Sequence, residues 1–264
     1  MSLARALAET LGLRGRAVAP RVLVTRSAEQ SGELMLALAA HGLDPVSVPA
    51  IEVVIVGLDG ARGTRPDWIV VTSSNGARAV LQDAGDHSPT LRAARWAAIG
   101  RATAALLERS GVDVVFRPSR SAGASLASEL PIGPGDRVLV VRGDLADDEL
   151  VASLRARGAS VDDVVAYRTL GAPASSRALL RRAAAGPIAA IVFTSGSTVR
   201  GLVALARTEA LNLASIPAVC IGPETAVAAR AAGFEVAAVS AEPGAKALAS
   251  AVARALLRQP MDVR

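Results

Sequence analysis

The sequence predicts an α/β protein built from doubly wound parallel sheets. Short runs of β-branched and apolar residues alternate along the chain with longer amphipathic segments rich in Ala, Leu and Arg. Apolar strands that alternate with helices are typical of parallel sheets covered on both faces. Three short phrases also occur twice, in the same order. Because 264 residues suffice for two domains of about 100–130 residues each, we expect two domains of similar size.

The elements expected in the first half follow one another regularly. The strands are RVLV (21–24), PVSV (45–48), WIVV (68–71), WAAI (96–99) and VDVV (112–115). The helices are GELMLALAAHG (32–42), GARAVLQDAG (76–85), ATAALLERSG (102–111) and AGASLASELP (122–131). Several of these helical segments end at glycine, as helices often do.

The second half repeats the first. AAIGRATA (97–104) and VCIGPETA (219–226) place Gly100 over Gly222 and Thr103 over Thr225, at an offset of 122. The same offset aligns WIVVTSS with AIVFTSG, and RVLVTR matches RVLVVR at an offset of 116. Three matching phrases in one order indicate a duplication. They favour two flavodoxin-like domains, whose ligands bind beyond the carboxyl ends of the strands.

Charge and hydropathy indicate which classes of partner, among small molecules, nucleic acids and membranes, this chain is expected to have. The net charge is +5, and Lys246 is the only lysine. This surplus fits attraction of an acidic small molecule, but taken alone it is better explained as keeping the protein soluble. No basic arm with interleaved aromatic residues is present, so we expect no nucleic-acid partner. No apolar run reaches the roughly 18–20 residues that cross a bilayer, and the N-terminus lacks an apolar signal core, so we expect no membrane partner and a cytoplasmic location.

The motifs of common cofactors are missing from the sequence. It holds neither a G-x-x-x-x-G-K-[ST] loop nor a strand followed by G-x-G-x-x-G, and it has no G-x-S-x-G. Two histidines and one cysteine offer no metal cluster, and neither histidine suits a Ser-His triad. Cys220 lies in the apolar run AVCI, which indicates a buried, inert thiol. We therefore expect no cofactor and no metal.

Four strand-to-helix turns are candidates for binding anions. Two strands end at Thr-Ser, before Asn75 and before Gly196, and two end at Gly100 and Gly222. Helix N-termini attract anions because free N–H groups and the helix dipole point outward. Each turn alone is better explained as an ordinary helix cap. Four such turns at corresponding strand ends favour a ligand with several carboxylates.

Tyr167 is the only tyrosine, in the segment SVDDVVAYRTLG. It can be a half-buried residue at a strand end, or a phenol that donates or relays a proton. The offset of 116 places Ile51 at the matching position of the first repeat, so the duplication does not copy Tyr167.

The ordered set of phrases resembles the uroporphyrinogen-III synthase family from about residue 21 to 255. The phrases are RVLVTR, HGLDPVSVPAIEV, DWIVVTSSNGARAV, AAIGRATAALLERSGVDVVFRP, RVLVVRGD, GASVDDVVAYRTL, IVFTSGSTV and CIGPETAVAARAAGFEV. The resemblance implies a discontinuous arrangement of two flavodoxin-like domains with a cleft. Domain 1 would comprise 1–46 and 172–264, domain 2 would comprise 56–158, and 47–55 and 159–171 would be the connecting strands.

The resemblance also implies a reaction. Hydroxymethylbilane, a linear tetrapyrrole with eight carboxylates, would lose its terminal hydroxyl and close with inversion of ring D to uroporphyrinogen III, without a cofactor. Tyr167 would be the catalytic candidate. The substrate-binding candidates are Thr25, Arg26, Ser73, Ser74, Asn75, Thr103, Arg142, Gly143, Ser195, Gly196, Ser197, Thr198 and Thr225. The family suggests a monomer, and a transient hand-off of the substrate from hydroxymethylbilane synthase is a further expectation.

The sequence departs from the family pattern at two places. Ser27 follows VTR where the family often has proline, and the helix after Arg142–Gly143 begins with the acidic run Asp147–Asp148–Glu149. The acidic run argues against carboxylate binding by that helix. Two other readings stay open: a non-catalytic tetrapyrrole-binding or sensor module on the same fold, and a two-domain solute-binding protein.

Overall fold

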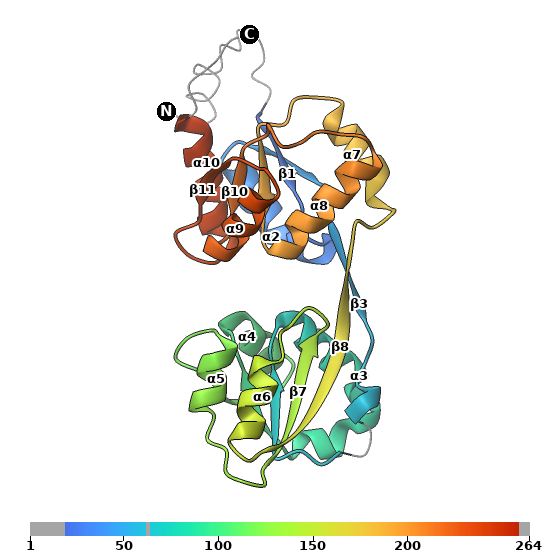
Figure 1. The fold of residues 1–264 in the computed structure, drawn as a ribbon, viewed down its shortest axis with the longest axis vertical. Coiled ribbons are helices and arrows are strands. Elements are labelled where there is room, and N and C mark those ends of the chain that lie inside the picture. Colours follow the sequence, from blue (N-terminus) through green and yellow to red (C-terminus); the bar gives the residue numbers. More distant parts are fainter. Residues whose placement is uncertain (1–18, 62–63, 259–264) are drawn as a thin grey trace. The chain divides into compact units, whose positions relative to one another are not determined.

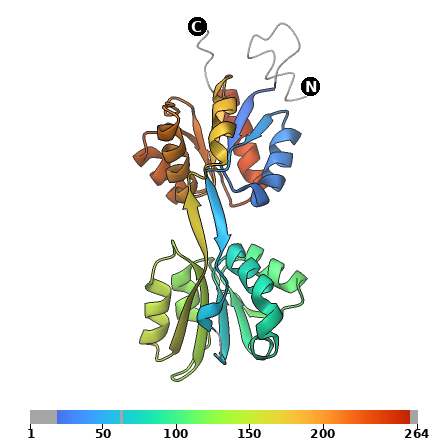
Figure 2. The same ribbon diagram turned by 90° about the vertical axis from the view of Figure 1, so that its right-hand side faces the viewer.

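The computed structural model describes residues 19–61 and 64–258. Contacts divide them into two compact units, which lie within 1–52 and 170–264 (unit 1) and within 53–169 (unit 2). The chain passes from unit 1 to unit 2 within strand β3 (Ile51–Ile55) and returns within strand β8 (Ser160–Gly171). These two strands are neighbours in one sheet and run in opposite directions (Figure 2).

Unit 1 contains a five-stranded sheet in the order β11-β10-β9-β1-β2, of which β11, β10 and β1 are labelled in Figure 1. Its neighbouring strands pair in parallel. The strands are β1 (Arg21–Val24), β2 (Asp44–Ser47), β9 (Ala190–Phe193), β10 (Ala218–Cys220) and β11 (Val236–Val239). The sheet therefore joins residues from both ends of the chain.

Helices cover both faces of the sheet of unit 1. They are α2 (Ala28–Ala40), α7 (Ser176–Ala184), α8 (Gly196–Thr208), α9 (Pro223–Ala231) and α10 (Ala245–Arg258). Val22 and Val24 of β1 pack in a cluster with apolar residues of α2 and α10. Leu23, between them, packs with residues of α7, α8 and α9 on the other face. This alternation is the side-chain period of a strand buried on both faces.

Unit 2 contains a six-stranded sheet in the order β3-β8-β7-β4-β5-β6. Its further strands are β4 (Trp68–Val71), β5 (Arg95–Ala98), β6 (Val114–Phe116) and β7 (Arg137–Gly143). Its helices are η1, a 3₁₀ turn (Asp59–Ala61), α3 (Ser74–Arg92), α4 (Arg101–Arg109), α5 (Gly123–Glu129) and α6 (Glu149–Ala156). Ile69 and Val71 pack with residues of α3 and α4, whereas Trp68 and Val70 pack with residues of α5 and α6.

The two sheets match strand for strand. Without β3, the order in unit 2 is β6-β5-β4-β7-β8, which corresponds to β11-β10-β9-β1-β2 in unit 1. The repeated phrases lie in corresponding strands: RVLV in β1 and β7, and the strands before Thr-Ser in β4 and β9. Apart from β3, each sheet therefore takes two strands from one repeat and three from the other. A cut at the repeat boundary would separate strands of the same sheet.

The prediction of an α/β fold with parallel sheets is confirmed. Every strand pair of β1, β2 and β4–β11 that is described in register runs parallel. Within residues 19–61 and 64–258, no helix has the length and apolar character to cross a bilayer.

Candidate functional site

The turns named from the sequence follow the carboxyl ends of strands. Ser73 follows β4 and precedes α3, and Ser195 follows β9 and precedes α8. Gly100 and Gly222 follow β5 and β10 and precede α4 and α9. Because neighbouring strands run parallel, the turns of one sheet lie at one edge, where α/β sheets bind their ligands. Each unit thus presents two of the four named helix N-termini at this edge of its sheet.

The serine turns cap their helices. Ser73 is extended, and its Oγ accepts a hydrogen bond from the N–H of Gly76 at 3.1 Å. Ser195 forms a capping box with Thr198, in which each side chain accepts from the other residue's N–H at 3.3 Å. The N–H groups of Gly196 and Ser197 have no acceptor among the described residues. They are donors that an anion can use.

The glycine turns leave more donors open. Gly100 has no side chain to cap α4, and the N–H groups of Arg101, Ala102 and Thr103 have no acceptor in the described part of the chain. In α9 the first position is Pro223, which has no N–H, and an acid, Glu224, occupies the first turn. An anion therefore meets a more favourable N-terminus at α4 than at α9.

Thr103 and Thr225 occupy the same position in the first turns of α4 and α9. They are 4% and 6% exposed. Neither hydroxyl has a hydrogen-bond partner among the residues the structure describes. Both stay candidates for substrate contact.

Tyr167 lies on β8, beside the N-terminus of α3. Its ring is half-buried, and the hydroxyl of Ser73 donates to its phenol oxygen at 2.9 Å. The same Ser73 oxygen accepts from the N–H of Gly76. The phenol is therefore joined to the N-terminus of a helix, 94 residues away in sequence. Two of the sequence-derived candidates meet in unit 2.

The backbone of Gly143 lies against the ring of Tyr167. These residues are partners across β7 and β8, just after a shift in register between Arg142 and Gly143. The next residue, Asp144, donates its N–H to the carbonyl of Tyr167 at 3.2 Å, and its carboxylate accepts from the N–H of Thr169 at 2.9 Å. Gly143, predicted as a substrate contact, is buried beneath the ring.

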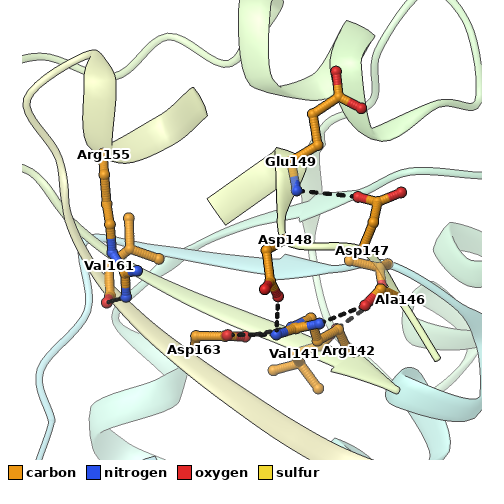
Figure 3. A network of polar contacts seen from close by, with 10 residues as sticks. Val141, Arg142, Ala146, Asp147, Asp148, Glu149, Arg155, Val161 and Asp163 are labelled. Atoms are coloured by element: carbon orange, nitrogen blue, oxygen red, sulfur yellow. Dashed lines mark hydrogen bonds and ion pairs between the residues drawn. The ribbon is translucent and has the colours of Figure 1, made fainter. Parts of the chain in front are cut away.

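Arg142 belongs to an internal network (Figure 3). Its guanidinium donates to both carboxylate oxygens of Asp163 at 2.6 and 2.7 Å, to Asp148 at 2.7 Å and to the carbonyl of Ala146 at 2.7 Å. The hydrogen bond with Asp163 raises the pKa of the arginine, against the opposing effect of burial. Only 9% of Arg142 is exposed. We therefore leave Arg142 out of the binding set, because its donors are already committed.

Two threonines of the predicted set also serve the fold. Thr25 is fully buried, and its hydroxyl donates to the carbonyl of Val192 at 2.7 Å. Thr198 is fully buried, and its hydroxyl donates to the carbonyl of Ser195 at 2.8 Å. Both hydroxyls are thus engaged within the fold, and substrate contact by Thr25 and Thr198 stays a prediction. Arg26, after β1, donates from Nε to Gln30 at 3.1 Å and is half-buried.

Asn75 and Ser197 lie in the first turns of α3 and α8. The Asn75 Oδ1 accepts from Arg78 at 3.2 Å. The Ser197 hydroxyl lies 2.8 Å from the Ser195 hydroxyl. Both residues are half-buried beside the capping serines.

Other titratable groups give no second site of this kind. In the described ranges no three His, Cys, Asp or Glu side chains gather as metal ligands. Cys220 is buried, and burial raises the pKa of its thiol to about 11, so the thiolate is disfavoured. A hollow in unit 2 is lined by residues at the starts of β5 and β6, among them Trp96 and Val112. It therefore lies at the opposite edge of the sheet from the turns.

Sequence comparison finds a match to the family model of uroporphyrinogen-III synthase HemD over residues 32–250. The chain is 32% identical over 221 residues to a porphyrin biosynthesis protein HemD from Ruminiclostridium josui. That match covers 80% of this chain and 44% of the relative, so the chain spans less than half of that protein. It is 29% identical to a chloroplastic uroporphyrinogen-III synthase from Oryza sativa subsp. japonica, covering 85% of this chain and 78% of the relative.

Structure comparison agrees on the fold. A crystal structure of a mutant uroporphyrinogen III synthase from the extremely thermophilic bacterium Thermus thermophilus matches with a TM-score of 0.64 at 22% identity. The match covers 91% of this chain and 100% of the other. A uroporphyrinogen-III synthetase from Helicobacter pylori matches with a TM-score of 0.63 at 18% identity, covering 88% of this chain and 97% of the other.

Proposed function

Because the chain belongs to the uroporphyrinogen-III synthase family, we propose that it carries out this family's reaction. Hydroxymethylbilane loses its terminal hydroxyl and closes with inversion of ring D to uroporphyrinogen III. In kind the protein is then a cyclising lyase. The observation that carries the residue-level proposal is the phenol of Tyr167, held by Ser73 at the N-terminus of α3.

Tyr167 is proposed to assist the loss of the hydroxyl. When Ser73 donates to the phenol oxygen, the phenol's own proton is left to point at a substrate. The C–O bond breaks, the phenolic proton goes to the leaving oxygen, and water departs. General acid catalysis of this kind typically contributes about 10²–10⁴-fold to a rate.

The carboxylates of the substrate are proposed to meet the helix N-termini. The supporting donors are the N–H groups of Ser74 at α3, of Arg101 to Thr103 at α4, and of Gly196 and Ser197 at α8. The half-buried residues Arg26, Asn75 and Ser195, with Thr103 and Thr225, complete the proposed binding set. Positioning and preorganised donors can select one ring closure without a strong nucleophile.

The finer description of the fold belongs to this proposal. The strand order of unit 1, renumbered within the unit, is 2-1-3-4-5, which supports a flavodoxin-like description. Two domains with connecting strands and a substrate cleft, as the resemblance implies, are part of the same proposal. So are a monomeric, cytoplasmic enzyme and a hand-off from hydroxymethylbilane synthase.

One assay tests the proposed reaction. Hydroxymethylbilane is generated in place by its upstream enzyme, the product is oxidised, and the isomers are separated. We expect isomer III with the protein present and isomer I, from spontaneous closure, without it. If only isomer I forms although the chain binds the tetrapyrrole, the protein is a binding module rather than a synthase.

The variant Tyr167→Phe tests the role of the phenol. It keeps the ring and removes the proton donor, so we expect kcat to fall about tenfold or more, within what a general acid contributes. Its circular dichroism and thermal midpoint should stay close to those of the parent protein. An unchanged kcat would exclude Tyr167 from the chemistry.

A further inference from the structure

The ring of Tyr167 occupies space that a side chain at position 143 would fill. A Cβ placed on Gly143 would lie 2.6 Å from Cε2 and 2.7 Å from the phenol oxygen of Tyr167, and closer still to Cζ. Carbon atoms in contact lie about 3.5–4.0 Å apart. Tyr167 cannot keep its position if residue 143 carries any side chain.

This close approach does not come from the backbone conformation of Gly143. Gly143 is absent from the glycines with positive φ, so its backbone conformation is open to other residues. Gly143 is also the last residue of β7 and pairs with Tyr167 in the ladder. The need for glycine here is therefore set by the ring and not by the turn.

The strand that carries the ring is held on both sides of position 143. On one side of position 143, Arg142 binds Asp163 of β8, and on the other, Asp144 binds the backbone at Tyr167 and Thr169. These contacts fix β8 against the end of β7. The hydroxyl of Ser73 then meets the phenol oxygen at 2.9 Å.

We propose that Gly143 is a positioning residue for Tyr167: its missing side chain leaves the space in which the ring lies, so that the phenol meets Ser73. This rests on the proposed function for its catalytic meaning, but its geometry can be tested without activity. Ser73 has two tasks in this arrangement, because it caps α3 and also orients the phenol. The matching position in the first repeat is Ser27, whose partner position, Ile51, carries no ring to accommodate.

The first test observes the ring directly. Tyr167 is the only tyrosine in the chain, so protein labelled with ¹³C in its tyrosine rings gives the signals of this residue alone. We expect Gly143→Ala and Ser73→Ala to shift these signals. Ser195→Ala removes the corresponding cap of α8, and Gly133→Ala adds a methyl that meets no atom within 4 Å. Both controls should leave the tyrosine signals in place, and an unshifted spectrum of Gly143→Ala would overturn the proposal.

The second test asks whether the methyl acts through the ring. Gly143→Ala should lower the denaturation midpoint, and it should lower it far less in a Tyr167→Leu background, where a smaller side chain leaves room. An equal loss in both backgrounds would show that Gly143 serves the backbone and would overturn the proposal. A denaturation midpoint can be measured for any variant that folds in the absence of denaturant, whether or not it is active.

The third test asks whether the position of the Tyr167 ring, as set by Gly143, affects kcat. Gly143→Ala should lower kcat about tenfold, toward the value of Tyr167→Phe, with a smaller change in KM. In the Tyr167→Phe background the same change should alter kcat less than about twofold, since residues that act as a unit are not additive. A full additional loss there would contradict the proposal. If the parent protein forms no isomer III, the proposed function fails, while the tyrosine signals still decide the role of Gly143.

Discussion

The Thr-Ser turns of the two units begin alike and end differently. In unit 1 the cap closes on itself: Ser195 and Thr198 exchange hydrogen bonds, and the second serine, Ser197, lies 2.8 Å from the first. In unit 2 the residue at the Thr198 position is Gly76, which has no side chain to complete a capping box. Ser73 keeps the cap with its oxygen and has its proton left to reach Tyr167.

This difference shows how a duplicated turn can gain a new task. A Cβ on Gly76 would lie 3.3 Å from the carbonyl oxygen of Val141, so unit 2 holds the start of α3 close to β7. The residue gained in unit 2 is Tyr167, on the strand next to β7. Unit 1 keeps the turn as a plain helix cap with open N–H donors, and unit 2 couples it to a phenol.

The helices that follow these turns, α8 and α3, differ in how closely they approach neighbouring backbone. This difference gives the largest expected change in the free energy of unfolding. Gly201 of α8 corresponds to Ala79 of α3. A Cβ on Gly201 would overlap the carbonyl oxygen of Ala50, which is backbone and cannot rotate away. We expect Gly201→Ala to destabilise the protein by about 3 kcal/mol, the upper range for overpacking, measured by chemical denaturation.

The matched change in unit 2 is Ala79→Gly. It removes a buried methyl and places glycine within a helix, where glycine costs about 1 kcal/mol relative to alanine. The two substitutions are opposite in chemistry, yet both should destabilise, and the change in unit 1 should cost more. A neutral Gly201→Ala would show that α8 does not press on Ala50.

Two arginines at matching positions of the repeats, Arg26 after β1 and Arg142 near the end of β7, give the next effect. Arg142 holds two carboxylates and a carbonyl, whereas Arg26, at the matching position, donates to the neutral amide of Gln30. Removing Arg142 leaves Asp163, 23% exposed, without its partner. Because that carboxylate is partly solvated, we expect Arg142→Met to cost about 2 kcal/mol, below the range for fully buried pairs.

Arg26→Met serves as the control in the same denaturation experiment. Its loss should be smaller, since the hydrogen bond from its Nε goes to a neutral amide rather than to a half-buried carboxylate. Equal losses would mean that the carboxylates at Arg142 contribute no more than the contacts of Arg26, of which the Gln30 amide is one. The Arg142 variant should also shift the tyrosine signals, because it releases β8 beside Tyr167.

The repeats and the alternation of strands and helices were readable from sequence because they depend on local pattern. RVLV in β1 and β7 and the Thr-Ser turns all lie where the phrases predicted. The role of Gly143 was not readable, since it depends on a ring that arrives from β8, 24 positions further along the chain. The hydrogen bond of the Thr25 hydroxyl was not readable either, because the carbonyl that accepts it belongs to β9, far along the chain. The network of Arg142 was not readable, because its acidic partners come from two other segments.

The smallest expected change in stability concerns the helical segments that precede β9 and β4, the two strands followed by Thr-Ser. In unit 1 this segment is α7, and Glu209 at the end of α8 accepts hydrogen bonds from its Arg177 at 2.6 Å and Arg181 at 3.0 Å. In unit 2 the segment is η1. The N–H of Leu58, just before η1, donates to the carboxylate of Asp83 in α3 at 2.6 Å. The ion pairs of Glu209 with Arg177 and Arg181, here called the clamp, thus correspond in unit 2 to a hydrogen bond from a backbone N–H.

The clamp predicts a pH dependence. The hydrogen bond from Arg177, followed by the charge of Arg181, holds the pKa of Glu209 below its usual range. A carboxyl whose pKa is lowered on folding stabilises the protein above its unfolded value of about 4.3, and this stability is lost as pH falls through the folded value. Glu209→Gln should therefore lower the denaturation midpoint at pH 7 and lose this difference in acid.

A matched control separates charge from hydrogen bonding. Glu129 of unit 2 also has a lowered pKa, but its chief cause is the hydrogen bonds from the hydroxyl and N–H of Ser119, each at 2.7 Å. Salt screens the attraction between charges more than it weakens hydrogen bonds from neutral donors. The Glu209 side chain is only 4% exposed, but those of Arg177 and Arg181 are 47% and 61% exposed, so salt reaches this pair from the arginine side. Added salt should therefore shrink the effect of Glu209→Gln and largely spare that of Glu129→Gln. If salt changed both equally, the arginines of α7 would not be the source of the stability at Glu209.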